Sequence, residues 1–149
     1  MEAVIFVGIQ GAGKSTFYKQ RFFDSHTRIN LDMLRTRHRE KLILEACLEA
    51  KQKFVVDNTN LTRAEREKYI FRAKEFRFKV VGYYFQSNIE KAIERNNQRE
   101  GKAKIPDKGV RSASKRLQIP SFDEGFNELF CVWINEENRF EVEEFLHLN

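Results

Sequence analysis

Residues 8–16 read Gly8-Ile9-Gln10-Gly11-Ala12-Gly13-Lys14-Ser15-Thr16 and contain the phosphate-loop pattern G-x-x-x-x-G-K-[ST] with every required position filled. The motif also has the context it needs, because an apolar strand pattern over residues 2–7 precedes it and a helical pattern over residues 14–23 follows it. Glycines let the backbone take positive φ and turn its N–H groups toward an anion at the helix N-terminus. The stretch therefore predicts a nucleoside triphosphate site.

The residue types of the loop indicate which chemistry it supports. Lys14 supplies a positive charge for the β- and γ-phosphates, and Ser15 offers its hydroxyl to Mg²⁺. A glycine turn that binds nothing is the alternative, and the agreement of motif and context argues against it. We expect ATP with Mg²⁺ here, and the expected nucleotide-binding residues of the loop are Gly8, Gly11, Ala12, Gly13, Lys14, Ser15 and Thr16.

Length and composition favour one globular domain. The chain has 149 residues, of which 41% are hydrophobic and 33% charged, and it contains fourteen Phe. Its two cysteines, Cys47 and Cys131, lie in separate apolar patterns, which favours core thiols in a reducing compartment over a disulfide framework. No stretch approaches the ~18 apolar residues of a membrane span, and residues 3–7 are too few for a signal peptide. We expect a single domain over residues 1–149, without membrane association, in the cytoplasm.

Apolar runs alternate with helical patterns along the rest of the chain. Strands are expected over residues 27–29, 53–56, 78–85 and 129–134. Helices are expected over residues 34–52, over 62–75 with a Thr62/Glu65 capping box, over 87–97 with Ser87 as the cap, and over 137–146. Together with the first strand, this alternation predicts an α/β fold with a five-stranded, mainly parallel sheet flanked by helices.

A basic segment follows the third of these helices. Its Lys and Arg residues outnumber its acidic ones and are Arg95, Arg99, Lys102, Lys104, Lys108, Arg111, Lys115 and Arg116. A solvated face is the plain interpretation of such a run, and a surface that holds phosphates is the functional one. Arg95 and Arg99 are four residues apart and so point the same way, as a lid over phosphates requires, although cations also offset a helix dipole at this position. We predict a basic lid over about residues 95–120.

The residues after the strand over 53–56 favour a kinase over a hydrolase. Asn58 follows Asp57, where an ATPase would carry a carboxylate that orients water, and no N-K-x-D motif for guanine is present. A substrate hydroxyl is then the economical acceptor. We expect Asp57 to hold a Mg²⁺-bound water and Thr59 or Asn60 to bond the substrate; a turn stabilised by local hydrogen bonds is the alternative.

Asp32 and Arg35 are a candidate catalytic pair. They follow the short strand over residues 27–29, at the carboxyl edge where parallel sheets bind ligands. On one helical turn the two side chains share a face, so that Asp32 could accept the proton of the acceptor hydroxyl while Arg35 holds a neighbouring phosphate. A surface ion pair is the plain alternative.

Taken together, these segments resemble the 5′-polynucleotide kinase domain of end-healing enzymes. The similar stretches are residues 8–16, Ile29-Asn30-Leu31-Asp32-Met33-Leu34-Arg35, Asp57-Asn58-Thr59-Asn60-Leu61, residues 95–103, Ile105-Pro106 and Val110-Arg111-Ser112. The resemblance implies that Asp32 is the general base, that Arg35 grips the phosphate on the 3′ side of the terminal nucleoside, and that Arg99 and Arg95 contact the ATP phosphates. No D-x-D-x-T phosphatase motif is present, and the part from Ser121 onward matches less well.

The expected activity is therefore ATP-dependent phosphorylation of a nucleic-acid 5′-hydroxyl. Lys14, Asp32, Arg35 and Arg99 are its expected catalytic residues. The expected acceptor is single-stranded or end-exposed RNA or DNA, with a separate phosphatase or ligase as a functional partner. A kinase for a small metabolite would share the loop and the lid, and a regulatory module that binds a nucleoside triphosphate without catalysis would share the loop alone.

Overall fold

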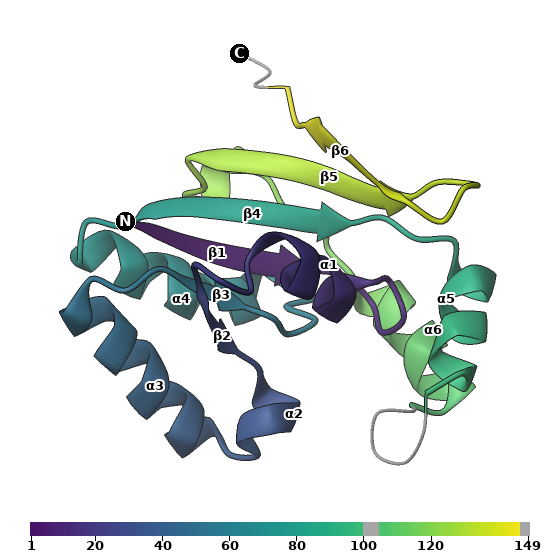
Figure 1. The fold of residues 1–149 in the computed structure, drawn as a ribbon, viewed down its shortest axis with the longest axis horizontal. Coiled ribbons are helices and arrows are strands. Elements are labelled where there is room, and N and C mark those ends of the chain that lie inside the picture. Colours follow the sequence, from purple (N-terminus) through teal and green to yellow (C-terminus); the bar gives the residue numbers. More distant parts are fainter. Residues whose placement is uncertain (100–104, 147–149) are drawn as a thin grey trace.

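The computed structural model describes residues 1–99 and 105–146, which form a six-stranded sheet in the order β2-β3-β1-β4-β5-β6 (Figure 1). The strands are β1 (Glu2–Val7), β2 (Thr27–Ile29), β3 (Phe54–Val56), β4 (Lys79–Phe85), β5 (Glu128–Ile134) and β6 (Phe140–Glu144). Neighbours from β2 to β5 pair in parallel, and β6 pairs with β5 in antiparallel fashion. The predicted α/β class with a mainly parallel sheet is confirmed.

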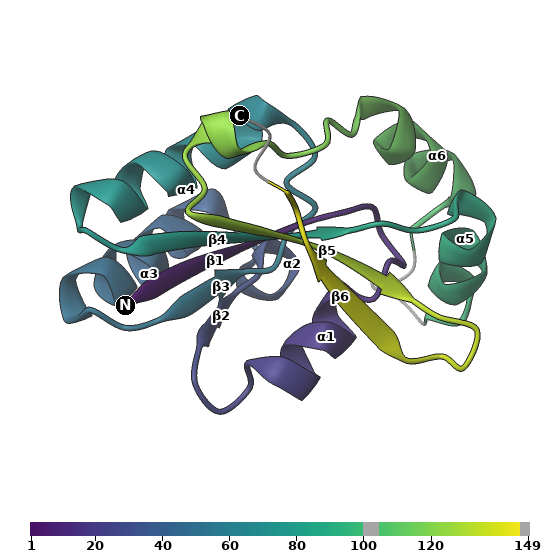
Figure 2. The same ribbon diagram turned by 90° about the horizontal axis from the view of Figure 1, so that it is seen from above.

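Helices cover both faces of the sheet and its carboxyl end. They are α1 (Lys14–Arg21), α2 (Leu31–Leu34), α3 (Arg37–Ala50), α4 (Arg63–Glu75), α5 (Ile89–Asn97), α6 (Asp107–Arg116) and the short 3₁₀ helix η2 (Phe122–Glu124). Figure 2 shows α3 and α4 on one face and α1 on the other, with α5 and α6 beyond the ends of the strands. No helix within the described ranges has both the length and the apolar composition that a membrane crossing requires.

The central strand β1 contributes to two apolar clusters, one on each face. Ala3, Ile5 and Val7 pack with residues of α3 and α4, while Val4 and Phe6 pack with residues of α1, α5 and α6. A strand buried on both sides has no polar face, which is why residues 3–7 read as one unbroken apolar run. This burial fixes the position of the loop that follows β1.

The last element is a strand, so the prediction of a closing helix over residues 137–146 and of five strands is wrong. A tight turn, in which Asn135 N–H donates to the carbonyl of Arg139 at 2.8 Å and Asn138 takes φ 61°, reverses the chain after β5. Phe140 and Val142 then point into the cluster on the α1 face, while Glu141 and Glu143 are exposed. Period-two alternation decides the strand, although glutamates favour helices by intrinsic propensity.

The predicted helix over residues 34–52 begins later, because Leu34 ends the short helix α2 and α3 begins at Arg37. Arg35 ends α2 with φ 77°, and Thr36 begins α3 as its N-cap, its hydroxyl accepting from the Arg39 N–H at 3.1 Å. Asp32 and Arg35 therefore do not share one helical face. A second correction concerns the cap of α5, which is Asn88 and not Ser87. The Thr62 cap of α4 is confirmed.

The predicted lid over residues 95–120 includes the end of α5 and the whole of α6. The part from 100 to 104, with Lys102 and Lys104, lies outside the described residues. Asn96 connects the two sides of this part, since its amide donates to the Ile105 carbonyl and its carbonyl accepts from the Ile105 N–H at 2.9 Å. Helix α6 lies wholly within this segment, and its Val110 and Ala113 are buried.

Candidate active site

The β1–α1 loop has the backbone of a phosphate-binding nest. Gly11 and Gly13 take φ 82° and 96°, and α1 begins at Lys14 directly after them. Gly11 also has no space for a side chain, because a Cβ there would lie 2.2 Å from the carbonyl oxygen of Ala92 in α5. Gly11 and Gly13 thus allow both the turn of the backbone and the close approach of α5. The loop presents its N–H groups at the N-terminus of α1, where an anion is stabilised.

The Lys14 ammonium is buried at the centre of this loop. It donates to the carbonyls of Gly8 at 2.8 Å and Ile9 at 2.7 Å. Burial lowers the pKa of this amine from its ordinary 10.5 to about 8, Arg99 adds to the shift, and the carboxylates of Asp57 and Asp32 oppose it. Lys14 is thus a cation held out of water at a cost in free energy, and an anionic phosphate bound beside it would offset that cost.

Ser15 of the loop and Asp57 after β3, the two residues expected to serve Mg²⁺, lie together. The Ser15 hydroxyl donates to Asp57 Oδ2 at 3.0 Å, and the Asp57 side chain is only 2% exposed. A hydroxyl and a carboxylate are hard oxygen donors of the kind that Mg²⁺ prefers. No group of three or more His, Cys, Asp or Glu side chains gathers into a metal site within residues 1–99 and 105–146. The pair therefore fits Mg²⁺ as a partial site that the oxygens of phosphates and water would complete.

Two cavities lie on either side of Arg99. The first has a volume of about 240 Å³, and its lining includes Lys14, Asp32 and Arg99. The second, of about 340 Å³, is lined by Gly11, Gly13, Thr16, Gln20, Arg95, Gln98, Arg99, Ile134, Asn138 and Phe140. Arg99 lines both, and Arg95 Nη1 lies 3.5 Å from the Gly11 carbonyl. The arginines predicted for the lid thus lie against the phosphate loop.

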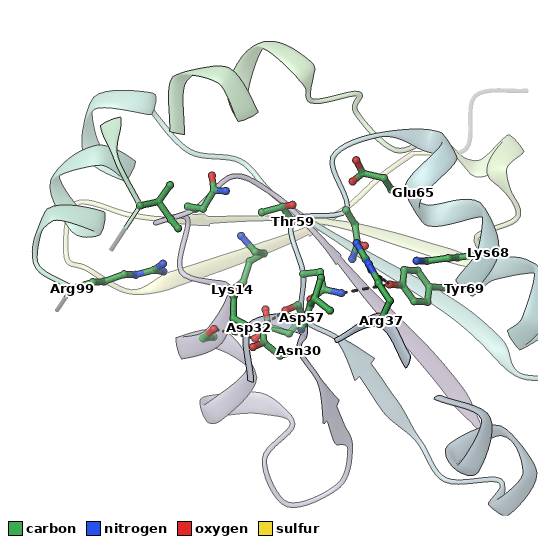
Figure 3. A pocket seen from close by; sticks show the side chains of 16 residues that line it. Lys14, Asn30, Asp32, Arg37, Asp57, Thr59, Glu65, Lys68, Tyr69 and Arg99 are labelled. Atoms are coloured by element: carbon green, nitrogen blue, oxygen red, sulfur yellow. Dashed lines mark hydrogen bonds between the residues drawn. The ribbon is translucent and has the colours of Figure 1, made fainter. Parts of the chain in front are cut away.

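Asp32 lies in the first cavity, held there by hydrogen bonds at the start of α2 (Figure 3). Asn30 caps the helix, its side-chain oxygen accepting from the Met33 N–H, while its amide donates to the Asp57 carbonyl at 2.6 Å. Asn58 Oδ1 accepts from the Leu31 N–H at 2.9 Å. Two side chains therefore tie the helix that carries Asp32 to the loop after β3.

The same loop fastens to β1 through Thr59 and Asn60. The Thr59 carbonyl accepts from the Gly8 N–H at 3.0 Å, and the buried Asn60 amide donates to the Phe6 carbonyl at 2.8 Å. Both residues line the first cavity, as the prediction that they bond substrate requires. The bond of Thr59 to Gly8 and that of Asn60 to β1 hold the phosphate loop in register with the loop after β3.

Arg35 is not among the residues that line the first cavity, and Arg37 and Lys68 lie at its far end instead. These two side chains surround the buried Glu40, whose carboxylate accepts from Arg37 Nη1 at 3.1 Å and from the Tyr69 hydroxyl at 2.8 Å. Lys68 Nζ lies 3.8 Å from the same carboxylate. Burial raises the pKa of the Tyr69 phenol, and the hydrogen bond and charge of Glu40 add to the shift. Sequence reasoning missed this cluster, since only the fold brings α3 and α4 together.

Comparison with known proteins identifies the family. A family model described as the AAA domain matches residues 4–120. The chain belongs to this family, which consists of P-loop kinases. The match includes the phosphate loop, Asp32, Asp57 and both lid arginines. This AAA-domain chain is accordingly a kinase-type enzyme that binds a nucleotide.

A curated relative extends the comparison beyond the family. The bifunctional polynucleotide phosphatase/kinase of Schizosaccharomyces pombe is 31% identical over 135 residues, which are 86% of this chain and 32% of that protein. The AAA-domain chain thus spans about a third of the length of this relative.

Solved structures confirm the fold at lower identity. A gluconokinase from Sinorhizobium meliloti has a TM-score of 0.60 and 19% identity, over 88% of this chain and 81% of the other. Kti12 of Chaetomium thermophilum, solved with ADP-AlF₃, has a TM-score of 0.64 and 17% identity, over 91% and 92%. At such identities the likeness shows the fold that this AAA-domain chain shares with both proteins.

Proposed function

We propose that this kinase transfers the γ-phosphoryl group of ATP to the 5′-hydroxyl end of a nucleic acid. The observation that carries the proposal is the meeting of Lys14, Asp32 and Arg99 in one cavity. Phosphoryl transfer needs cations for the developing charge and a carboxylate for the proton of the hydroxyl, and this cavity offers both. The fission-yeast relative, named for polynucleotide phosphatase and kinase, supports the class of acceptor.

Each residue of the donor side has a distinct role in the proposal. The loop N–H groups and Lys14 bind the β- and γ-phosphates, while Arg95 approaches the same phosphates from the last turn of α5 and Arg99 from the residues after it. Ser15 and Asp57 would hold Mg²⁺, which supplies positive charge to the phosphate oxygens when it is bound. The second cavity, between the loop and residues 134–140, offers space for the nucleoside.

Asp32 is the proposed general base for the acceptor hydroxyl. It lies at the rim of the sheet, in the same cavity as Lys14, and its helix is fastened by Asn30 and Asn58. A carboxylate held in this way can accept a proton from a hydroxyl directed at the phosphoryl group. Because Asn30 and Asn58 already bond backbone groups, they position Asp32 and do not compete for the acceptor.

The far end of the cavity offers cations for the acceptor's own phosphate. Arg37 and Lys68 have side chains that are 61% and 51% exposed, and both lie near the single buried carboxylate of Glu40. The resemblance assigns the 3′-phosphate to Arg35, whose backbone turns away from the α2 face at φ 77°. We propose that Arg37 meets this phosphate, with Arg35 as the competing assignment. The 5′-phosphate product is a substrate for a ligase, which would be the functional partner.

The test is a transfer assay with γ-labelled ATP and three acceptors. One is a 5′-hydroxyl oligonucleotide as DNA and as RNA, the second is the same oligonucleotide with a 5′-phosphate, and the third is a pool of sugars. We expect label on the 5′-hydroxyl strands alone, and strong loss of transfer with Asp32→Asn. Label on sugars alone would support a metabolite kinase, and nucleotide binding without transfer would support a regulatory module; either result would refute the proposal.

A further inference from the structure

Arg28 in β2 is bonded to both residues of the metal subsite. Its Nε donates to Asp57 Oδ2 at 2.9 Å, and its Nη2 donates to the Ser15 hydroxyl at 3.0 Å. Ser15 in turn donates to the same Asp57 oxygen at 3.0 Å. The three side chains form a closed triangle in which one guanidinium already bonds the two oxygen groups that we expect to serve Mg²⁺.

Within this triangle Arg28 neutralises the buried carboxylate and occupies positions that a metal ion would need. A carboxylate that is 2% exposed is costly without a partner, and Arg28 neutralises it with a charge-assisted bond. A hydroxyl oxygen has two lone pairs, and Arg28 occupies one of those on Ser15. A divalent ion at this pair would lie within a few ångströms of the guanidinium, where like charges repel each other strongly.

Arg28 is partly exposed, so its guanidinium can either stay bonded to Ser15 and Asp57 or move away from them. Arg28 is 26% exposed, its Cζ lies 5.9 Å from the centroid of the Tyr18 ring, and it is not one of the residues that line the first cavity. It therefore approaches Ser15 and Asp57 from the β2 side. Lys14 is a further cation next to Asp57, since Asp57 opposes the lowering of its pKa.

We propose that Arg28 is a resident counter-cation of the metal subsite, which competes with Mg²⁺ for Ser15 and Asp57. The inference rests on the nucleotide site of the proposed function. Because the guanidinium already supplies part of the charge that Mg²⁺ would bring, the nucleotide binds with little help from the metal. Removing Arg28 leaves Asp57 without this partner, so that Mg²⁺ takes its place and binds more tightly.

The experiment measures the dissociation constant of the fluorescent analogue mant-ADP in EDTA and in excess Mg²⁺. The variants are Arg28→Gln, which removes the charge, and Arg28→Lys, which keeps it. Arg21→Gln is the matched control, since Arg21 is an exposed arginine at the end of α1 that stacks on the Phe17 ring. Melting temperatures of the nucleotide-free proteins, with and without Mg²⁺, provide a second readout.

For the wild type, Arg21→Gln and Arg28→Lys we expect similar mant-ADP affinity in EDTA and in Mg²⁺. For Arg28→Gln we expect the dissociation constant in EDTA divided by that in Mg²⁺ to be about tenfold higher than for the wild type, which is about 1.4 kcal/mol. Mg²⁺ alone should raise the melting temperature of Arg28→Gln and not that of the wild type.

Three results would overturn the inference. The first is a ratio of the mant-ADP dissociation constants, EDTA over Mg²⁺, that is already above about tenfold in the wild type. The second is a ratio in Arg28→Gln that does not differ from that of the wild type. The third is a ratio in Arg28→Lys equal to that in Arg28→Gln. A complete lack of mant-ADP binding by the wild type would instead refute the nucleotide site, and this inference with it.

Discussion

Replacement of Lys14 by methionine should abolish nucleotide binding and yet remove a cost from the folded protein. The fall of the Lys14 pKa from 10.5 to about 8 corresponds to about 3 kcal/mol, at ~1.4 kcal/mol per pH unit. Below pH 8 both the folded and the unfolded chain hold this proton, so the folded state bears the full cost of the buried charge. Between pH 8 and 10.5 only the unfolded chain holds it, and wild-type stability rises with pH.

Methionine also loses the bonds to the Gly8 and Ile9 carbonyls, at about 0.5–1.5 kcal/mol each, but this loss does not depend on pH. From pH 7 to pH 9.5 we therefore expect the free energy of unfolding of the wild type to rise by about 2 kcal/mol relative to that of Lys14→Met. Urea unfolding of the nucleotide-free proteins at both pH values measures it. Lys19→Met, on the exposed side of α1, should stay within about 0.5 kcal/mol of wild type at both values. A difference between Lys14→Met and wild type that stays constant over this range would refute the reasoning.

Two further predictions concern the candidate site, and a third concerns a buried ion pair between α4 and η2. Asp32→Asn should lower kcat by about 10²–10⁴ while the KM for ATP changes by less than about threefold; a kcat within threefold of wild type would remove Asp32 from the mechanism. Arg37→Ala should reduce kcat/KM for a nucleoside 3′-phosphate by about tenfold or more and for the bare nucleoside far less, whereas the same pattern in Arg35→Ala alone would favour the assignment by resemblance. Arg66→Met should destabilise the protein by about 3–5 kcal/mol in urea, because it leaves Glu124, 2% exposed and paired with Arg66 at 2.8 Å, without its cation. Arg63→Met, which breaks the exposed pair with Asp123, is the matched control and should cost less than about 1 kcal/mol.

The predictable part of the fold is local or strictly periodic. The phosphate loop, the strands before Asp57 and Gln86, and the Thr62 cap each depend on residues within a few positions of one another. The errors arise where two local signals compete. Glu141, Glu143 and Glu144 favour a helix, but Phe140 and Val142 can reach the core only from a strand.

The residues of the candidate site likewise fall into those that the sequence could place and those that it could not. Lys14, Ser15, Asp32 and Asp57 follow strand ends, and parallel strands bring their carboxyl ends to one edge, so their meeting could be predicted. The turn at Arg35 could not, because nothing around residue 35 signals a positive φ, and the error placed Arg35 on a face it does not share.

Other contacts between distant segments had no sequence signal. Arg28 and Asp57 are 29 residues apart, Arg37 and Tyr69 are 32 apart, and Arg66 and Glu124 are 58 apart. From the sequence alone, a charged residue in a short strand is expected at the edge of a sheet, and an arginine on a helix is expected in solvent. Only the pairing of β2 with β3, the approach of α3 to α4 and the packing of α4 against η2 give these side chains their partners.

A structure with a non-hydrolysable ATP analogue and a 5′-hydroxyl dinucleotide tests the central claim most directly. We expect the γ-phosphate to lie between Lys14 and Arg99, and the 5′-oxygen to lie within hydrogen-bonding distance of the Asp32 carboxylate. A dinucleotide whose 5′-oxygen lies away from Asp32, with the nucleotide bound in the loop, would contradict it.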